Sequence, residues 1–164
     1  GVVTDARAMY NLLVEHKART HVHIDGIAAS AASFLAMAGS EITISEGGFV
    51  MIHNARSVTM GDANDHRRMV TVLDQVNQTI IDTYVARTKQ DAKKVTKWMD
   101  DETWFTGKEA VAAGFADNIV ANMQVAASLA HSEMFKNLPA ILRPNRVSAA
   151  AALTAMNAAL KVAK

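Results

Sequence analysis

The chain has 164 residues, of which half are hydrophobic and a fifth are charged, and its formal net charge is +1. This length is enough for a single domain with its own hydrophobic core. The sequence contains no cysteine, which excludes disulfides, thiolate metal sites and cysteine nucleophiles, and no long apolar run predicts a membrane span.

Charge is unevenly distributed along the chain. Residues 134–164 contain five basic residues and no acidic residue, so the rest of the chain is slightly acidic. That balance argues against nucleic-acid binding through the main domain. Because no signal peptide is recognisable either, we expect a cytoplasmic protein that binds neither nucleic acid nor a membrane.

The first part of the chain predicts alternating helices and strands. Met9, Leu12 and Leu13 recur at helical spacing, which is typical of an amphipathic helix. Polar and apolar residues then alternate as in a strand, and an almost wholly apolar segment ending at Gly39 predicts a short buried helix. This pattern indicates an α/β layered domain. Its predicted elements are helix 5–17, strand 20–25, helix 30–39, and strands 41–44 and 49–53.

A long helix is predicted in the middle of the chain. Apolar side chains recur on one face over residues 62–88, and Asp62 or Asn64 would cap its start. The predicted helix is longer than most helices of globular proteins, so we expect part of its apolar face to contact another subunit. A loop at 54–61 precedes this helix. The helix is followed by helices at 91–100 and 107–113 and a strand at 115–120.

The composition changes near residue 122. Residues 122–164 are rich in alanine and contain both prolines of the chain. We therefore divide the chain into a body, residues 1–121, and a C-terminal extension, residues 122–164, with a helix predicted at 148–163.

Ser30 and His53 give the strongest indication of chemistry. Ser30 lies at the start of an apolar helix, where backbone N–H groups have no partner. A serine there can be a nucleophile beside half of an oxyanion hole, or simply the cap of the helix. His53 ends an apolar strand and could be the base that takes the serine proton, or a hydrogen-bonded histidine without a catalytic role.

Three motifs resemble the proteolytic subunit of Clp protease. They are Gly-x-Ala-Ala-Ser at 26–30, Met-Ile-His at 51–53, and Phe-Thr-Gly-Lys-Glu-Ala…Gly-Phe-Ala-Asp at 105–117, in the family's order and with similar spacing. The resemblance covers roughly residues 1–120. It implies an α/β, Clp-protease/crotonase-like layered fold in which the long helix is the family's handle, and it makes residues 1–121 the catalytic domain.

A narrower resemblance points to the phage-encoded branch of this family, the Clp-like head-maturation proteases. The segment Glu-Thr-Trp-Phe-Thr at 102–106 is similar to that branch, as are the segments at 125–129 and 135–139.

The resemblance assigns Ser30 as the nucleophile and His53 as the general base. An ungapped match through 105–117 places the family's triad aspartate on Glu102, which is a departure in residue type. Asp101 is the alternative third member, and a Ser–His dyad remains open. If Glu102 orients His53, we expect a Glu102 oxygen within about 3.2 Å of the ring nitrogen that does not face Ser30.

The resemblance also implies an oxyanion hole and a substrate-binding segment. The backbone N–H of Ala31 would be one oxyanion donor, and Gly1 aligns with the second glycine of a pair that supplies the other. The strands that precede this pair in the family are missing, so we expect the chain to be part of a longer polypeptide. A peptide would bind as an added strand along residues 55–61, with Ser57, Val58 and Thr59 as the substrate-binding residues.

These features predict a serine endopeptidase that forms a homo-oligomeric ring and acts on capsid or scaffold protein during phage head assembly. No cofactor and no metal are expected, and no phosphate-binding loop is present, so any ATP-driven unfolding would belong to a partner. Two alternatives remain. One is a ring-forming assembly or scaffold protein that has lost proteolysis, and the other is a crotonase-like acyl-CoA enzyme.

Overall fold

The computed structural model describes residues 1–121 and 134–143. Helices and short strands alternate along the chain, as expected for a layered α/β protein. The helices are α1 (Val3–Glu15), α2 (Ala31–Ala36), α3 (Ala63–Thr88), α4 (Ala92–Asp100) and α5 (Gly107–Ala113), with the short 3-10 helix η2 at Ala140–Leu142. The strands are β1 (His21–Ile24), β2 (Ile27–Ala29), β3 (Glu41–Ser45), β4 (Phe49–Ile52), β5 (Thr103–Thr106) and β6 (Asn118–Val120).

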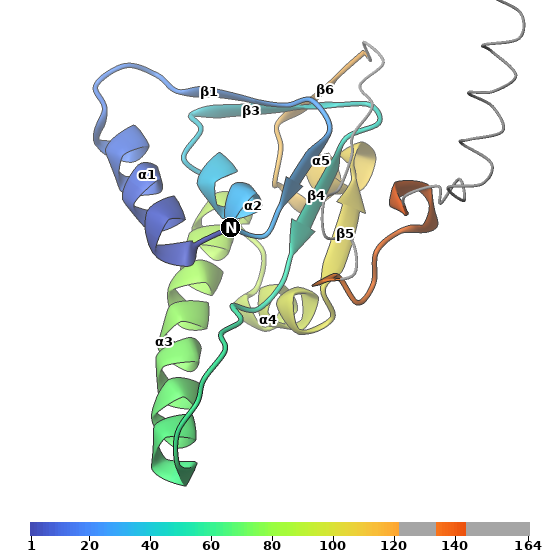
Figure 1. The fold of residues 1–164 in the computed structure, drawn as a ribbon. Coiled ribbons are helices and arrows are strands. Elements are labelled where there is room, and N and C mark those ends of the chain that lie inside the picture. The colour runs from blue at the N-terminus through green and yellow to red at the C-terminus, as the bar shows by residue number, and fades with distance from the viewer. Residues whose placement is uncertain (122–133, 144–164) are drawn as a thin grey trace, which may run out of the picture.

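The strands form two sheets of three. One sheet has the order β1-β3-β6, and all its pairs are parallel; the other has the order β2-β4-β5, with β2 and β4 parallel and β5 antiparallel to β4. The chain therefore follows the same pattern twice. β1 lies in one sheet and β2 in the other before α2, and β3 and β4 are divided in the same way before α3. Figure 1 shows α2 and α3 following β2 and β4, with α3 extending away from the sheets.

An aromatic cluster joins the second sheet to the helices. The ring of Phe115 lies 5.6 Å from Tyr84 of α3, 5.0 Å from Phe105 of β5 and 6.1 Å from Trp98 of α4. Aromatic pairs at such distances contribute beyond the area they bury. This cluster fixes α3, α4 and β5 around one core.

The N-terminal half of the long helix α3 projects from the core, and its C-terminal end is buried in the core. Asp62 caps its start in a reciprocal capping box with Asp65, as proposed from the sequence. Its buried residues all lie in its last third, from Ile80 onwards, whereas Val70 and Val72 are exposed. Figure 1 shows this first part of α3 standing clear of the sheets.

The structure corrects four details of the predicted elements. A strand at Ile27–Ala29 was missed because it is only three residues long and two of them are alanines, which are poor strand formers. The predicted helix 30–39 ends early, at Ala36, and the strand predicted over 115–120 begins only at Asn118. Met9 and Leu12 on α1 are exposed, and α1 buries Ala6 instead.

The helix predicted at 148–163 lies outside the described residues. Within the described part of the chain, no helix is both long enough and apolar enough to span a membrane.

Candidate active site

The sheet β2-β4-β5 brings three sequence-distant residues to one edge. Strands β2 and β4 are parallel with Ala29 opposite Met51, so the residues that follow them, Ser30 and His53, emerge on the same side. Strand β5 runs antiparallel, with Thr103 opposite Ile52. The residue before it, Glu102, therefore lies at the same edge.

Ser30 has a backbone conformation that is rare for a serine. Its φ is 58° and its ψ is −123°, which places it outside the ordinary regions and costs free energy. Hydrogen bonds on both sides hold it there, because its N–H donates to the carbonyl of Met51 and its own carbonyl accepts from Phe34 N–H. Its hydroxyl makes no cap hydrogen bond to α2, so the capping interpretation is wrong.

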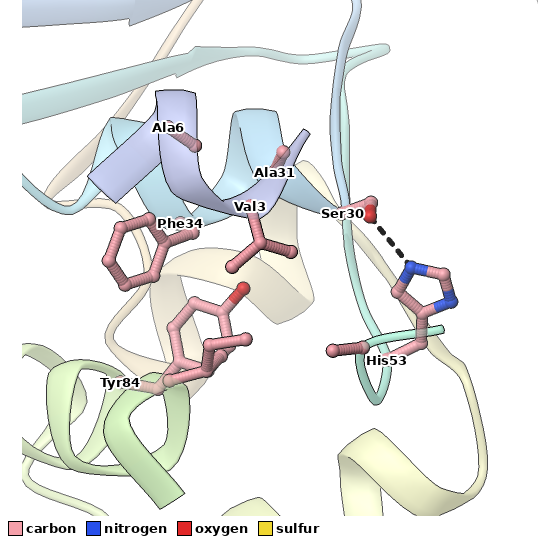
Figure 2. Close-up of a pocket in the computed structure, with 9 residues that line it drawn as sticks. Val3, Ala6, Ser30, Ala31, Phe34, His53 and Tyr84 are labelled. Carbon is pink, nitrogen blue, oxygen red and sulfur yellow. Dashed lines mark hydrogen bonds between the residues drawn. The ribbon is translucent and has the colours of Figure 1, made fainter. Parts of the chain in front are cut away.

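The hydroxyl of Ser30 is instead directed at His53. Ser30 Oγ lies 2.7 Å from His53 Nε2, and Figure 2 shows this pair at the rim of an apolar pocket. Val3, Ala31, Phe34 and Tyr84 are among the residues that line the pocket. This is the separation that a serine nucleophile and its general base require.

His53 is mostly buried, with its side chain 13% exposed. Burial, reinforced by the nearby Arg56 guanidinium, lowers the pKa of His53 to about 4, and the opposing effect of Glu102 is smaller. The ring is therefore neutral at pH 7, which is the state in which its nitrogen can accept the serine proton.

Glu102 is the acid nearest to the free side of the histidine ring, but it does not bind the ring. Its Oε2 lies 3.9 Å from His53 Nδ1, longer than the expected 3.2 Å. The reason is competition: Arg56 Nη2 lies 2.5 Å from Oε2, and the backbone N–H of Asn137 donates to Oε1 at 2.8 Å. Among the residues that the structure describes, His53 Nδ1 consequently has no hydrogen-bond partner, although it is buried.

The neighbouring aspartates face other groups. The carboxylate of Asp101 pairs with Lys97 at 2.7 Å on an exposed surface, and Asp100 accepts a hydrogen bond from Asn54. Glu102 is 3% exposed and has a φ of 49°, so the chain turns sharply to direct this carboxylate inward. Between the two candidates, the geometry brings Glu102 to the pair and leaves Asp101 outside.

The other predicted site residues surround this edge. Ala31 is the first residue of α2, where a backbone N–H has no acceptor within the helix. Gly1 lines a cleft together with Ser30 and His53. Ser57, Val58 and Thr59 lie in the segment between β4 and α3, where Val58 is 97% exposed. Figure 1 shows this segment running beside α3.

Several contributors to the site were not found from the sequence. Arg56 and Asn137 carry no motif, and they reach Glu102 only because the chain folds back on itself. Ser33 is buried in the core, where its hydroxyl donates to the carbonyl of Ser30 at 2.6 Å and contacts Tyr84 Oη. Its spacing of three residues from Ser30 on a helix is the signal that could have suggested this role. In the described parts of the chain, no cluster of three or more acidic or histidine side chains could hold a metal ion.

Comparison with known families identifies the family of this chain. The model of the Clp protease family matches residues 1–123, a span that includes Ser30, His53 and Glu102 and well over half of the chain. The chain therefore belongs to the Clp protease family, and membership of that family implies a serine peptidase.

Proposed function

We propose that this chain is a serine endopeptidase in which Ser30 is the nucleophile, His53 the general base and Glu102 the acid that orients His53. The observation that carries the proposal is the 2.7 Å contact between Ser30 Oγ and His53 Nε2. A hydroxyl is a weak nucleophile until a neighbouring base accepts its proton. The strained backbone of Ser30 supports the same role, since strain persists at sites where function requires it.

The reaction proceeds through an acyl-enzyme. Ser30 Oγ attacks the carbonyl carbon of the scissile bond while its proton passes to His53 Nε2. The tetrahedral oxyanion then collapses, the C–N bond breaks, and His53 returns the proton to the leaving amine. Water, deprotonated by His53, attacks the ester; the bond to Ser30 breaks, and a carboxylic acid and the free hydroxyl result.

Backbone groups stabilise the oxyanion. The N–H of Ala31, at the start of α2, is the donor on one side, and Gly1 is placed beside it: a Cβ atom added to Gly1 would lie 3.0 Å from the Cβ of Ala31. A peptide would lie along the exposed segment that contains Ser57, Val58 and Thr59 and pair with it as an added strand. The reaction itself needs no cofactor, and ATP-driven unfolding would fall to a partner.

The substrate we propose is a capsid or scaffold protein of a phage, cleaved during head assembly in the host cytoplasm or the prohead. The support is the similarity of residues 102–106, 125–129 and 135–139 to the phage-encoded branch of the family. A homo-oligomeric ring is proposed for the working enzyme. The exposed apolar residues Val70 and Val72 on the projecting half of α3 favour such contacts between copies.

Labelling with a fluorophosphonate tests the nucleophile directly. The wild-type chain is expected to be labelled at Ser30, and Ser30→Ala and His53→Ala are expected to lose labelling and peptide hydrolysis by several powers of ten. Matched controls come from the surface, where Ser40 and His23 are both exposed. Ser40→Ala and His23→Ala should be labelled like wild type.

The same experiment separates the alternatives. A folded wild-type chain that is never labelled would favour the assembly protein without proteolysis. Near wild-type hydrolysis by Ser30→Ala would show that the nucleophile is misassigned. Cleavage of a capsid or scaffold protein by wild type, but not by Ser30→Ala, would support the phage assignment.

A further inference from the structure

Residues 134–138 return to the candidate active site from the far end of the chain. Figure 1 shows the described C-terminal segment, in orange and red, near β5. Arg56 Nη1 donates to the carbonyl of Met134 at 2.6 Å, and the side-chain amide of Asn137 donates to the carbonyl of Asp101. Leu138 is buried, at 6% exposed. The segment is thus fixed by polar contacts along its length and by one apolar anchor.

The same segment forms a wall of the cleft in front of Ser30. Met134 and Phe135 line that cleft together with Ser30, His53 and Arg56. The ring of Phe135 lies 6.4 Å from the His53 ring and 5.5 Å from the ring of Trp104. A polypeptide approaching Ser30 from this side meets residues 134 and 135 first.

Docking of the segment also occupies one of the two oxygens of the Glu102 carboxylate. One carboxylate oxygen accepts from Asn137 N–H and the other from Arg56. Buried His53 Nδ1 has no partner within residues 1–121 and 134–143. Leaving a buried donor unpaired is unfavourable. In the docked arrangement, Glu102 therefore accepts hydrogen bonds from the segment and from Arg56 but not from His53. His53 is the group that Glu102 has to orient in the proposed catalysis.

We propose that residues 134–138 are an autoinhibitory strap, clasped by Arg56, that diverts Glu102 from His53 and narrows access to Ser30 until the strap undocks. This proposal rests on the proposed peptidase function. Undocking removes the Asn137 contact from Glu102 and the Met134 contact from Arg56. With Oε1 released and Arg56 no longer anchored to Met134, Glu102 can turn towards His53 Nδ1, which is 3.9 Å from its Oε2.

The full-length chain allows a matched test. Leu138→Asp places a charge at the buried anchor and should release the strap, whereas Ile141→Asp makes a comparable change three residues later, at a side chain that is 81% exposed. The readout is the rate of fluorophosphonate labelling at Ser30. If fewer than about one molecule in ten is undocked in the wild type, release raises the rate by at least about tenfold. Ile141→Asp should label at the wild-type rate.

A second variant covers the case in which Leu138→Asp fails to fold. Phe135→Ala removes the ring beside His53 without introducing a charge, and it should also raise the labelling rate. Circular dichroism and thermal unfolding establish that each variant is folded. The structural readout is the imidazole NMR spectrum of His53 in a Ser30→Ala background, where release should bring a hydrogen-bonded Nδ1–H signal that the docked chain lacks.

Each outcome decides between the two proposals. Equal labelling of wild type, Leu138→Asp, Phe135→Ala and Ile141→Asp would overturn the strap and leave the peptidase assignment in place. Slower labelling of folded Leu138→Asp and Phe135→Ala would also overturn it, because the segment would then complete the site instead of restraining it. No labelling in any folded variant would overturn the peptidase function, and the strap proposal with it.

Discussion

Ser33 and Tyr84, which are 51 residues apart in the sequence, share a hydrogen bond of 2.9 Å between their hydroxyl oxygens. Both side chains are buried, and burial raises the pKa of Tyr84 well above its usual range. Ser33 also donates to the carbonyl of Ser30. One short network therefore ties the long helix α3 to the turn that carries the candidate nucleophile.

Removing the Ser33 hydroxyl is expected to weaken the fold more than the chemistry. Ser33→Ala leaves the buried Tyr84 hydroxyl without this partner, so the free energy of unfolding should fall by about 1–3 kcal/mol. Urea denaturation measures this loss. The double variant Ser33→Ala/Tyr84→Phe should cost less than the sum of the single variants, because no orphaned hydroxyl remains. Strict additivity would show that the hydrogen bond contributes nothing.

Glu102 and Asp101 can be separated by isosteric amide variants. Glu102→Gln is expected to lower kcat/KM by up to about 10⁴, because an amide cannot stabilise the imidazolium of His53. Asp101→Asn should retain wild-type activity, since the Asp101 carboxylate pairs with Lys97 on the surface. The reverse pattern would transfer the role to Asp101, and full activity in both variants would indicate a Ser–His dyad.

The charge of Arg56 should contribute, together with burial, to the lower pH limit of activity. Only neutral His53 accepts a proton, so activity rises as pH rises through the pKa of His53, which burial and Arg56 lower to about 4. The groups that face this ring are Arg56, Glu102 and the amino group of Gly1. Arg56→Gln removes a positive charge that disfavours the imidazolium, so the acid limb of the pH–rate profile should move to higher pH.

Arg56→Lys is the matched control for that shift, because it keeps the positive charge and changes the geometry. Its acid limb should stay closer to that of wild type than the limb of Arg56→Gln. Identical profiles for Arg56→Gln and wild type would show that burial alone depresses the pKa of His53.

The projecting half of α3 is expected to be covered by another copy of the chain. Met69, Leu73 and Val76 continue the apolar face of the helix but are only partly buried, whereas the residues from Ile80 onwards reach the core. Light scattering should show an oligomer, and Leu73→Lys should shift it towards smaller species. Thr71→Lys, at an exposed position of the same helix, should leave the size unchanged. A fully active wild-type monomer would contradict the expectation.

Local sequence identified the residues that we propose carry the chemistry. The short motifs around Ser30 and His53, and the ungapped register that selects Glu102, are chemical patterns that need no three-dimensional information. Periodicity placed the long helix correctly, because an apolar stripe of period 3.6 over many residues is a strong signal. Strand β2 gave no comparable signal, since three residues with two alanines have little β propensity of their own and pair only because β4 lies beside them.

Only the tertiary structure decided how Ser30, His53 and Glu102 come together and which other groups bind Glu102. Ser30 and His53 become neighbours because β2 and β4 are parallel, and Glu102 joins them because β5 is antiparallel to β4. Neither strand direction nor pairing is encoded in a local pattern. The engagement of Glu102 by Arg56 and Asn137 depends on contacts between segments 46 and 35 residues apart in the sequence. Burial, which lowers the pKa of His53, likewise exists only once the whole core has packed around the ring.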